Sequence, residues 1–229
     1  MSSLFIVATP IGNLEDITYR AIRILSEVDL IAAEDTRQTK ILLDRYQIHT
    51  PLTSYHKFNI KAKTQHIVDL LKQGKKIALV SDSGTPGISD PGYELIKVAA
   101  EQGIRVEPIP GPSAVIAALS AAGLPTDRFV FEGFLQKKPG KKRKALSALS
   151  KEDRTIIIYE SPFRLLKTLD EIKNIFGSRP LAVCRELTKK FEEIVRGSAQ
   201  EVLEYFKTKA VKGEIVIVIS GQEAQRERE

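Results

Sequence analysis

The first half of the chain alternates short apolar runs with longer amphipathic stretches, and this alternation limits the folds that it can adopt. The apolar runs are LFIVA (4–8), LIAA (30–33), IALV (77–80) and RVEPI (105–109). They are short and bounded by loop residues, as β-strands are. The stretches between them, at 16–28, 36–46, 61–73 and 90–102, have apolar residues at helical spacing. Regular alternation of strands and helices predicts an α/β fold with a mainly parallel sheet.

The second half begins after PIPGPS (108–113), whose prolines interrupt regular structure. Strands are expected at 129–134, 155–159, 180–186, 192–197 and 214–220, and helices at 114–122, 161–175 and 198–209. The last helix opens with Ser198 and Glu201 at the spacing of a capping box. Because strands outnumber helices here, we expect a mixed sheet. We therefore predict two α/β domains, residues 1–112 and 113–229, and regard the polar end QEAQRERE as frayed.

Composition excludes several classes of protein. No apolar run approaches the roughly 20 residues of a membrane span, and the start MSSLFIVATP lacks the basic region of a signal peptide. We therefore expect a cytoplasmic protein with no membrane partner. The single cysteine, Cys184, lies in an expected strand and so is expected to be buried. The three histidines show no ligand-like spacing with Cys184, so no metal site is expected.

Positive charge is concentrated in one short segment. The net charge is +6 and the pI about 9.3, which favours a polyanionic partner. The segment KKPGKKRK (137–144) carries six cations, namely Lys137, Lys138, Lys141, Lys142, Arg143 and Lys144. Either this segment is a solvated surface loop, or it contacts the phosphates of a nucleic acid and releases counterions on binding.

The segment VSDSGTPGISDPG (80–92) is long, polar and rich in glycine and proline, and it follows an expected buried strand. In open α/β sheets, ligands bind beyond the carboxyl ends of strands. Glycines there permit close approach, prolines rigidify the loop, and Asp82 can accept hydrogen bonds from an amino or hydroxyl group. The alternative is a structural turn. In either case we expect Asp90 to cap the next helix and Pro91 to occupy its first position.

Four further polar loops follow expected strands, so several loops could converge on one site. They are ATPIGNLEDIT (8–18), AAEDTRQT (32–39), PGPSA (110–114) and YESPFR (159–164). The first has one glycine and no phosphate-loop lysine, which argues against nucleotide hydrolysis. In the second, Glu34, Asp35 and Arg37 form either a solvated helix start with a local ion pair or part of a functional site.

Six of these segments occur in an order that resembles a known family. LFIVATPIGNLEDIT, AEDTR, ALVSDSGTPGISDPG, PIPGPSA, YESPFR and RELTKKFEE look like the tetrapyrrole methylase superfamily of S-adenosylmethionine-dependent methyltransferases. Within it, they are most similar to members that 2'-O-methylate a cytidine in the decoding region of 16S ribosomal RNA. The resemblance extends from Leu4 to about Gly221, and it is specific because all six segments are in register.

The resemblance implies two α/β domains with the cofactor in a cleft between them, and a homodimer. It implies cofactor contacts at Asp82, Gly84, Thr85, Ser113, Ala114 and Tyr159. Pro10, Gly12 and Asn13 of the first loop would face the acceptor. Corrin and siroheme methylases usually carry a G-x-G-x-G-D-like first loop, whereas this chain has ATPIGN, which favours 16S rRNA or the small ribosomal subunit as partner. RNA contacts are then expected from the six cations of 137–144, Arg164 and Arg185.

Two departures from the family pattern narrow the catalytic candidates. Phe163 and Phe191 stand where related sequences often have histidine, so a histidine base at either position is excluded. The candidate bases are Glu34, Asp35 and Glu160, with Arg37, Arg164, Arg185 and Lys190 as groups that either bind phosphates or orient the reactants. Two alternative functions are methylation of a tetrapyrrole or another substrate on the same fold, and a non-catalytic RNA-binding assembly factor.

Overall fold

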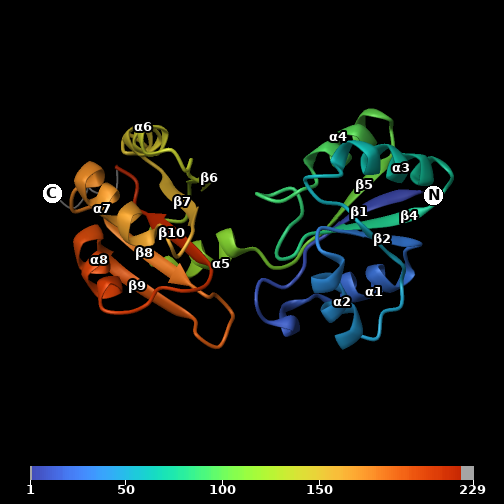
Figure 1. Ribbon diagram of the computed structural model, residues 1–229, viewed down its shortest axis with the longest axis horizontal. Helices are drawn as coiled ribbons and strands as arrows, with labels where there is room; N and C mark the ends of the chain where they lie inside the picture. The colour runs from blue at the N-terminus through green and yellow to red at the C-terminus, as the bar shows by residue number, and fades with distance from the viewer. Residues whose placement is uncertain (1, 223–229) are drawn as a thin grey trace. The chain divides into compact units, whose positions relative to one another are not determined.

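The computed structural model describes residues 2–222 and divides the chain into two compact units, Met1–Ser113 and Ala114–Glu229. The sequence had placed this boundary one residue earlier, between 112 and 113. Each unit contains its own five-stranded sheet (Figure 1). The expected α/β class with two sheets is confirmed.

The N-terminal unit is built on a parallel sheet. Its strands are β1 (Ser3–Val7), β2 (Leu30–Ala33), β3 (Leu52–Ser54), β4 (Lys76–Val80) and β5 (Arg105–Ile109), in the order β3-β2-β4-β1-β5. Its α-helices are α1 (Tyr19–Glu27), α2 (Thr36–Arg45), α3 (Ile60–Lys72) and α4 (Tyr93–Glu101), and a 3₁₀ helix spans Leu14–Asp16. All four strand pairings are parallel. The expectation of a mainly parallel sheet is therefore confirmed.

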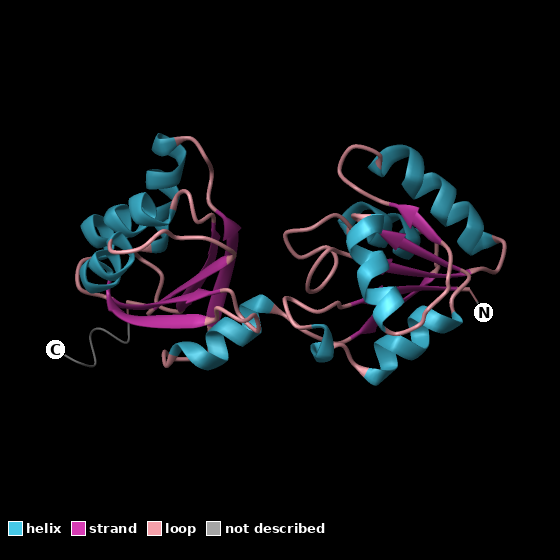
Figure 2. Ribbon diagram, turned by 60° about the horizontal axis from the view of Figure 1, so that its bottom comes forward, coloured by secondary structure: helices cyan, strands magenta, loops and turns pink. Residues whose placement is uncertain are grey.

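Helices cover both faces of this sheet, as Figure 2 shows. Helices α1 and α2 pack on one face, and α3 and α4 on the other. Strand β4 contributes to both layers, with Ala78 and Val80 in one apolar cluster and Ile77 and Leu79 in the other. A strand buried on both faces reads as a continuous apolar run, which explains why IALV predicts a strand without alternation.

The C-terminal unit has a mixed sheet. Its strands are β6 (Phe129–Phe134), β7 (Thr155–Glu160), β8 (Pro180–Arg185), β9 (Glu193–Ser198) and β10 (Ile215–Ile219), in the order β6-β7-β10-β8-β9. Its helices are α5 (Ala114–Ala122), α6 (Pro139–Leu149), α7 (Leu165–Phe176) and α8 (Ala199–Lys207). Only β6 and β7 pair in parallel, and the other three pairings are antiparallel. The expected mixed sheet is confirmed.

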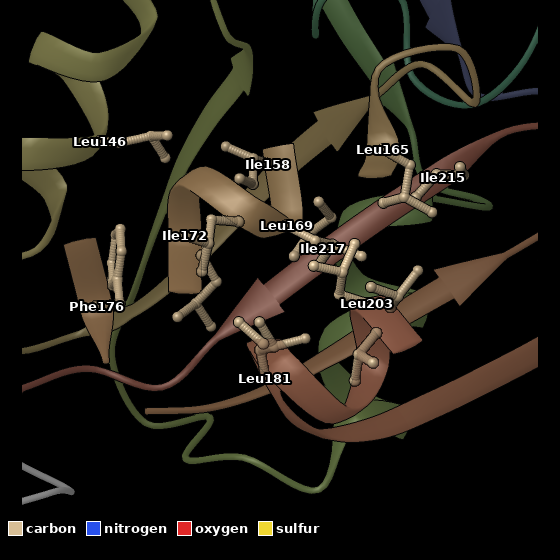
Figure 3. Close-up of a cluster of buried hydrophobic side chains, with 14 of the residues drawn as sticks. Leu146, Ile158, Leu165, Leu169, Ile172, Phe176, Leu181, Leu203, Ile215 and Ile217 are labelled. Carbon is tan, nitrogen blue, oxygen red and sulfur yellow. The ribbon is translucent and has the colours of Figure 1, made fainter. Parts of the chain in front are cut away.

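The two faces of the second sheet are covered unequally. Helices α6, α7 and α8 pack on one face, where Leu146, Ile172 and Leu203 belong to one apolar cluster with residues of the central strand β10 (Figure 3). Helix α5 covers the other face, where Cys184 of β8 is buried beneath it. Burial raises the pKa of this thiol to about 11, which makes it a poor nucleophile, in agreement with the expected apolar role.

Two expectations about helix starts need correction. Helix α4 begins at Tyr93 with Gly92 as N-cap, so Asp90 is not the cap and Pro91 is not in the first turn. Gly92 has φ 151°, and a Cβ there would lie 2.9 Å from the backbone nitrogen of Gly87, so the loop folds back tightly on itself before the helix starts. The segment 137–144 is not a loop throughout, because α6 starts at Pro139.

The capping box of α8 is confirmed, with Ser198 and Glu201 each bonding the backbone of the other. The expectation of a frayed end concerns residues that, apart from Gln222, lie outside the described part of the chain.

Candidate functional site

Four loops of the N-terminal unit follow the carboxyl ends of β1, β2, β4 and β5. Because the strands are parallel, these loops emerge at one edge of the sheet. Two of them are bonded directly to each other, since Thr9 N donates to Gly84 O at 2.9 Å and Gly84 N to Thr9 O at 3.0 Å. The Thr9 hydroxyl also donates to the carbonyl of Ser81 at 3.1 Å. Gly84 has φ 76°, a conformation that glycine adopts without strain.

The loop after β2 is bonded to the loop after β4. The backbone nitrogen of Asp35 donates to Asp82 Oδ1 at 2.9 Å. The Asp35 carboxylate accepts from the Arg37 backbone at 2.8 Å, which caps α2, and also accepts from Arg37 Nε and Nη2 at 3.1 and 2.6 Å. These bonds lower the pKa of Asp35 to about 2. Asp35 is therefore a weak proton acceptor, and the local ion pair considered for this segment is present.

Glu34 has the opposite electrostatic setting. Burial, and then the negative charge of Asp82, raises the pKa of Glu34 above its usual value. Burial likewise raises the pKa of Asp82. Proton affinity is therefore higher at Glu34 than at Asp35, which makes Glu34 the better general base of the two.

A pocket of about 110 Å³ lies between the loops after β1 and β4 and helix α2. Its walls include Thr9, Pro10 and Asp82 from the loops and Gln38, Thr39 and Leu42 from α2. The helix residues of this pocket are not among the sites expected from the sequence. The available signal was the spacing from Asp35 to Thr39, which places both residues on one face of α2.

The residues expected to contact the cofactor lie in both units. Asp82, Gly84 and Thr85 lie in the loop after β4, Ser113 ends the first unit, and Ala114 begins α5. Tyr159 lies in β7, and its ring packs edge-on against Phe131 and Phe134 at centroid distances of 4.9 and 5.4 Å.

Two glycines allow the loops at this edge of the N-terminal sheet to approach one another closely. At Gly84 and Gly111 the chain presents backbone and no side chain, and a Cβ on Gly111 would lie 3.0 Å from Cβ of Ala8. The loops after β4 and β5 therefore both pack closely against the loop after β1.

In the C-terminal unit, Glu160 is tied into a buried network. Its side chain has no exposed surface, and it accepts hydrogen bonds from Ser161 N at 2.7 Å, Arg164 Nε at 2.7 Å and Thr168 Oγ1 at 2.6 Å. Arg164 also donates to the carbonyl of Leu135. Glu160 is therefore a structural hydrogen-bond acceptor and not the base that the sequence suggested. Arg164 is its hydrogen-bond partner and not the expected phosphate contact.

Lys142 also belongs to this network and is not free for phosphates. Its side chain is 5% exposed, and Nζ donates to Thr168 Oγ1 at 3.1 Å. Nζ also lies 3.0 Å from Glu171 Oε2, an ion pair without hydrogen-bond geometry, since Oε2 accepts no hydrogen bond. Lys142 is therefore a buried structural residue and not the RNA contact expected from the sequence. The other five cations of the segment are exposed, namely Lys137, Lys138, Lys141, Arg143 and Lys144.

Arg185 is likewise used within the protein. Its guanidinium donates to Glu193 at 2.5 Å and to the carbonyls of Lys212 and Phe191, so it holds the loop after β8 and is corrected from an RNA contact. Lys190 is exposed, 5.6 Å from the ring centroid of Phe191.

Two exposed aromatic rings lie at one end of the second sheet. Phe163 is 96% exposed and Phe191 65%. They follow β7 and β8, whose last residues both pair with Ile215 of β10, so the two loops emerge at the same end of the sheet. The sequence had indicated only that these positions lack histidine.

The fold and the loops at its sheet edge define an α/β ligand-binding protein of two units, with polar, glycine-bearing loops beyond the strands. Residues 3–203 match the family described as Tetrapyrrole (Corrin/Porphyrin) Methylases, and the chain belongs to this family. The resemblance drawn from the six segments is thereby confirmed. The family consists of S-adenosylmethionine-dependent methyltransferases, which makes S-adenosylmethionine the cofactor.

Curated relatives match the chain over nearly its whole length. A protein of Thermotoga maritima is 50% identical over 223 residues, which are 97% of this chain and 100% of that one. A protein of Synechocystis is 53% identical over 222 residues, covering 96% of this chain and 80% of that one. A protein of Escherichia coli O157:H7 is 50% identical over 227 residues, covering 98% and 79%. Each is named ribosomal RNA small subunit methyltransferase I.

Solved structures show the same fold at low identity. A cobalt precorrin-4 methyltransferase matches with a TM-score of 0.72 and 21% identity, covering 95% of this chain and 94% of that one. A diphthine synthase matches with a TM-score of 0.71 and 12% identity, covering 96% and 90%. Within residues 2–222, no helix is long and apolar enough to cross a membrane, and no group of three or more metal-ligating side chains is present.

Proposed function

We propose that this protein transfers a methyl group from S-adenosylmethionine to the 2'-oxygen of a cytidine in the decoding region of 16S rRNA, acting on the small ribosomal subunit in the cytoplasm. The observation that carries this proposal is the set of relatives about 50% identical over nearly the whole chain, all named for methylation of small-subunit rRNA. The ribose as acceptor rests on the likeness of the first loop, ATPIGN, to that of RNA-modifying members.

Glu34 is the proposed general base. S-adenosylmethionine supplies an activated methyl group, so the protein's task is to align the ribose hydroxyl and to accept its proton. Glu34 lies directly after β2, half-buried, with a pKa raised by burial and by the charge of Asp82. Asp35 and Arg37, bonded to each other, hold the start of α2 and with it the position of Glu34.

The proposed cofactor contacts are Asp82, Gly84 and Thr85 of the first unit, its last residue Ser113, and Ala114 and Tyr159 of the second. Pro10, Gly12 and Asn13 form the proposed acceptor side. The bonds between Thr9 and Gly84 support this assignment, because they hold the proposed acceptor loop directly against the proposed cofactor loop within one unit.

The proposed RNA contacts are the exposed cations at the start of α6 and Lys190. Five cations between 137 and 144 are exposed and carry no ion pair with a carboxylate in the described structure. They can neutralise phosphates without choosing a base. A homodimer, implied by the family resemblance, would present two such segments to one subunit, and sedimentation of the purified protein measures the oligomeric state.

The decisive experiment is transfer from labelled S-adenosylmethionine to small subunits isolated from cells that lack this protein. Mass spectrometry of the nucleosides should find one 2'-O-methylcytidine per subunit. A substrate with deoxycytidine at the target should bind but accept no methyl group, because only the 2'-hydroxyl is missing. A methyl group on a base would refute the ribose assignment. Cofactor binding without transfer to RNA would favour a tetrapyrrole or other substrate, and RNA binding without cofactor binding a non-catalytic assembly factor.

A further inference from the structure

The pocket between the first loop and α2 has the size of a single aromatic ring. Its volume is about 110 Å³. An apolar protein cavity of roughly 150 Å³ holds benzene, so a pocket slightly smaller and open to solvent accommodates one six-membered ring entering by its edge.

One wall of the pocket carries a buried hydroxyl without a partner. Thr39 is 5% exposed, and its Oγ1 has no hydrogen-bond partner among the described residues. Its backbone nitrogen makes the regular helical bond to the carbonyl of Asp35 at 3.0 Å, so the helix itself is undistorted. Buried hydroxyls are nearly always paired, which points to a ligand that completes this one.

The remaining walls combine apolar surface with a hydrogen-bond acceptor. Pro10, Leu14 and Leu42 supply flat apolar contact. The Asp82 carboxylate accepts the backbone N–H of Asp35 through Oδ1 and has further acceptor capacity, because a carboxylate can accept up to about four hydrogen bonds. The pocket thus presents an unpaired hydroxyl and a carboxylate around an apolar slot, whose lining also includes Gln38 and the paired hydroxyls of Thr9 and Ser81.

We propose that this pocket binds the pyrimidine ring of the nucleotide to be methylated and selects cytosine. The inference rests on the proposed function and adds to it the residues that read the base. The exocyclic amino group of cytosine donates to the Asp82 carboxylate, and the Thr39 hydroxyl donates to the neighbouring ring nitrogen N3, which in uracil carries a proton and cannot accept. Uracil has a carbonyl in place of that amino group, and its oxygen would face the carboxylate without a proton between them.

The position of the pocket agrees with transfer to the ribose of the same nucleotide. Asp82 opens the loop that holds the proposed cofactor contacts, and it lies close enough to Glu34, the proposed base, for its charge to raise the pKa of Glu34. A base held against Asp82 therefore leaves its own ribose beside the cofactor loop and the proton acceptor. This arrangement requires the target nucleotide to be turned out of any stack, as enzymes that act on nucleotides commonly do.

The test combines two variants with an RNA that lacks the target base. Thr39→Val removes the hydroxyl at nearly constant volume, and Thr39→Leu fills the pocket. Thr39→Val should lower kcat/KM for small subunits roughly tenfold, equivalent to about 1.4 kcal/mol for one hydrogen bond, and should reduce the preference for cytidine over uridine at the target. Affinity for S-adenosylmethionine, measured by calorimetry, should not change in either variant.

Thr64→Val is the matched control. Thr64 is a buried threonine of α3 in the same unit, but its hydroxyl is paired with Tyr55 Oη at 2.9 Å and lies outside the pocket. Thr64→Val should lower the melting temperature and leave the cytidine preference unchanged. Thr39→Val should not lower it, because the hydroxyl removed is unpaired in the free protein.

RNA affinity without cofactor provides an independent measurement. An abasic ribose at the target should weaken binding to the wild-type protein at least tenfold and should have no effect on Thr39→Leu, whose pocket is already filled. An equal effect of the abasic site on both proteins, or an unchanged cytidine preference in Thr39→Val, would overturn the pocket assignment while leaving the methyltransferase function intact. Failure of the wild type to methylate small subunits would instead refute the proposed function, and with it the inference.

Discussion

Replacing Lys142 by alanine should destabilise the C-terminal unit strongly, although the residue lies in a segment that the sequence suggested to be surface. The side chains of Lys142 and Glu171 are 5% and 10% exposed, with Nζ and Oε2 3.0 Å apart. Removing one partner of a buried ion pair leaves the other charge without compensation, which costs about 3–5 kcal/mol. Lys142→Ala should therefore lower the free energy of unfolding by about 3–5 kcal/mol.

The measurement needs a probe other than tryptophan fluorescence and has to distinguish the two units. The chain has no tryptophan, so urea unfolding is followed by far-ultraviolet circular dichroism, and amide hydrogen exchange assigns the loss to a unit. The protection lost should lie in α6 and α7. Lys141→Ala, at an exposed neighbouring position, should change stability by less than about 0.5 kcal/mol. The double variant Lys142→Met with Glu171→Leu should recover most of the stability, because it leaves no unpaired charge.

RNA binding tests the alternative role of Lys142, a contact to a phosphate. If Lys142 were a phosphate contact, its removal would reduce the slope of log affinity against log salt concentration by roughly 0.7–0.9. Unchanged unfolding of Lys142→Ala together with such a reduced slope would refute the reasoning and return Lys142 to the RNA-binding cations.

Three further predictions concern the proposed site. Glu34→Gln should reduce kcat at least a hundredfold with unchanged cofactor affinity, and wild-type kcat/KM should rise as pH passes the raised pKa of Glu34. A carboxyl whose pKa is higher in the folded than in the unfolded chain stabilises the fold below the unfolded pKa of 4.5, and this contribution is lost as pH rises through the raised pKa. Glu34→Gln should therefore not lower the melting temperature at pH 7. Replacing Lys141, Arg143 and Lys144 together by glutamine should flatten the salt dependence of RNA binding by roughly 2–3 in slope and leave cofactor affinity unchanged; a retained slope would exclude them as phosphate contacts. Gly84→Val forces a branched residue to φ 76° and should weaken S-adenosylmethionine binding more than tenfold by calorimetry, whereas unchanged affinity would remove the 82–85 loop from the cofactor site.

The central strands could be predicted from the sequence because burial on both faces leaves a continuous apolar run. Residues 77–80 are such a run, and so are 215–219. Strand β3, Leu52–Ser54, was missed because three half-buried residues at the edge of a sheet give no periodic signal. Helix α6 was missed because its first half is dominated by charge, and the burial of Lys142 depends on Glu171, which lies 29 positions away in the sequence.

The candidate site could be predicted only as far as chain order determines it. Loops that follow parallel strands must share one edge of the sheet, so the positions of Glu34 and Asp82 follow from the alternation of strands and helices. Whether a carboxylate is free or paired is determined by contacts between segments distant in sequence. Glu160, for example, reads as a candidate base from the sequence, although Thr168 on α7 and Arg164 occupy its carboxylate. The helical spacing from Asp35 to Thr39 gives the face of Thr39, but the pocket itself is formed only where the loop after β1 lies against α2.

The pair of hydrogen bonds between Thr9 and Gly84 has a consequence for loop motion. Two separate loops that fluctuate independently would vary the gap between a methyl donor held by one and an acceptor held by the other. Because Thr9 and Gly84 each donate to and accept from the other, and the Thr9 hydroxyl adds a third bond at Ser81, the two loops are expected to move together. In the proposed reaction, a thermal displacement of one loop would then carry donor and acceptor in the same direction. The distance that the methyl group must cross would stay nearly constant.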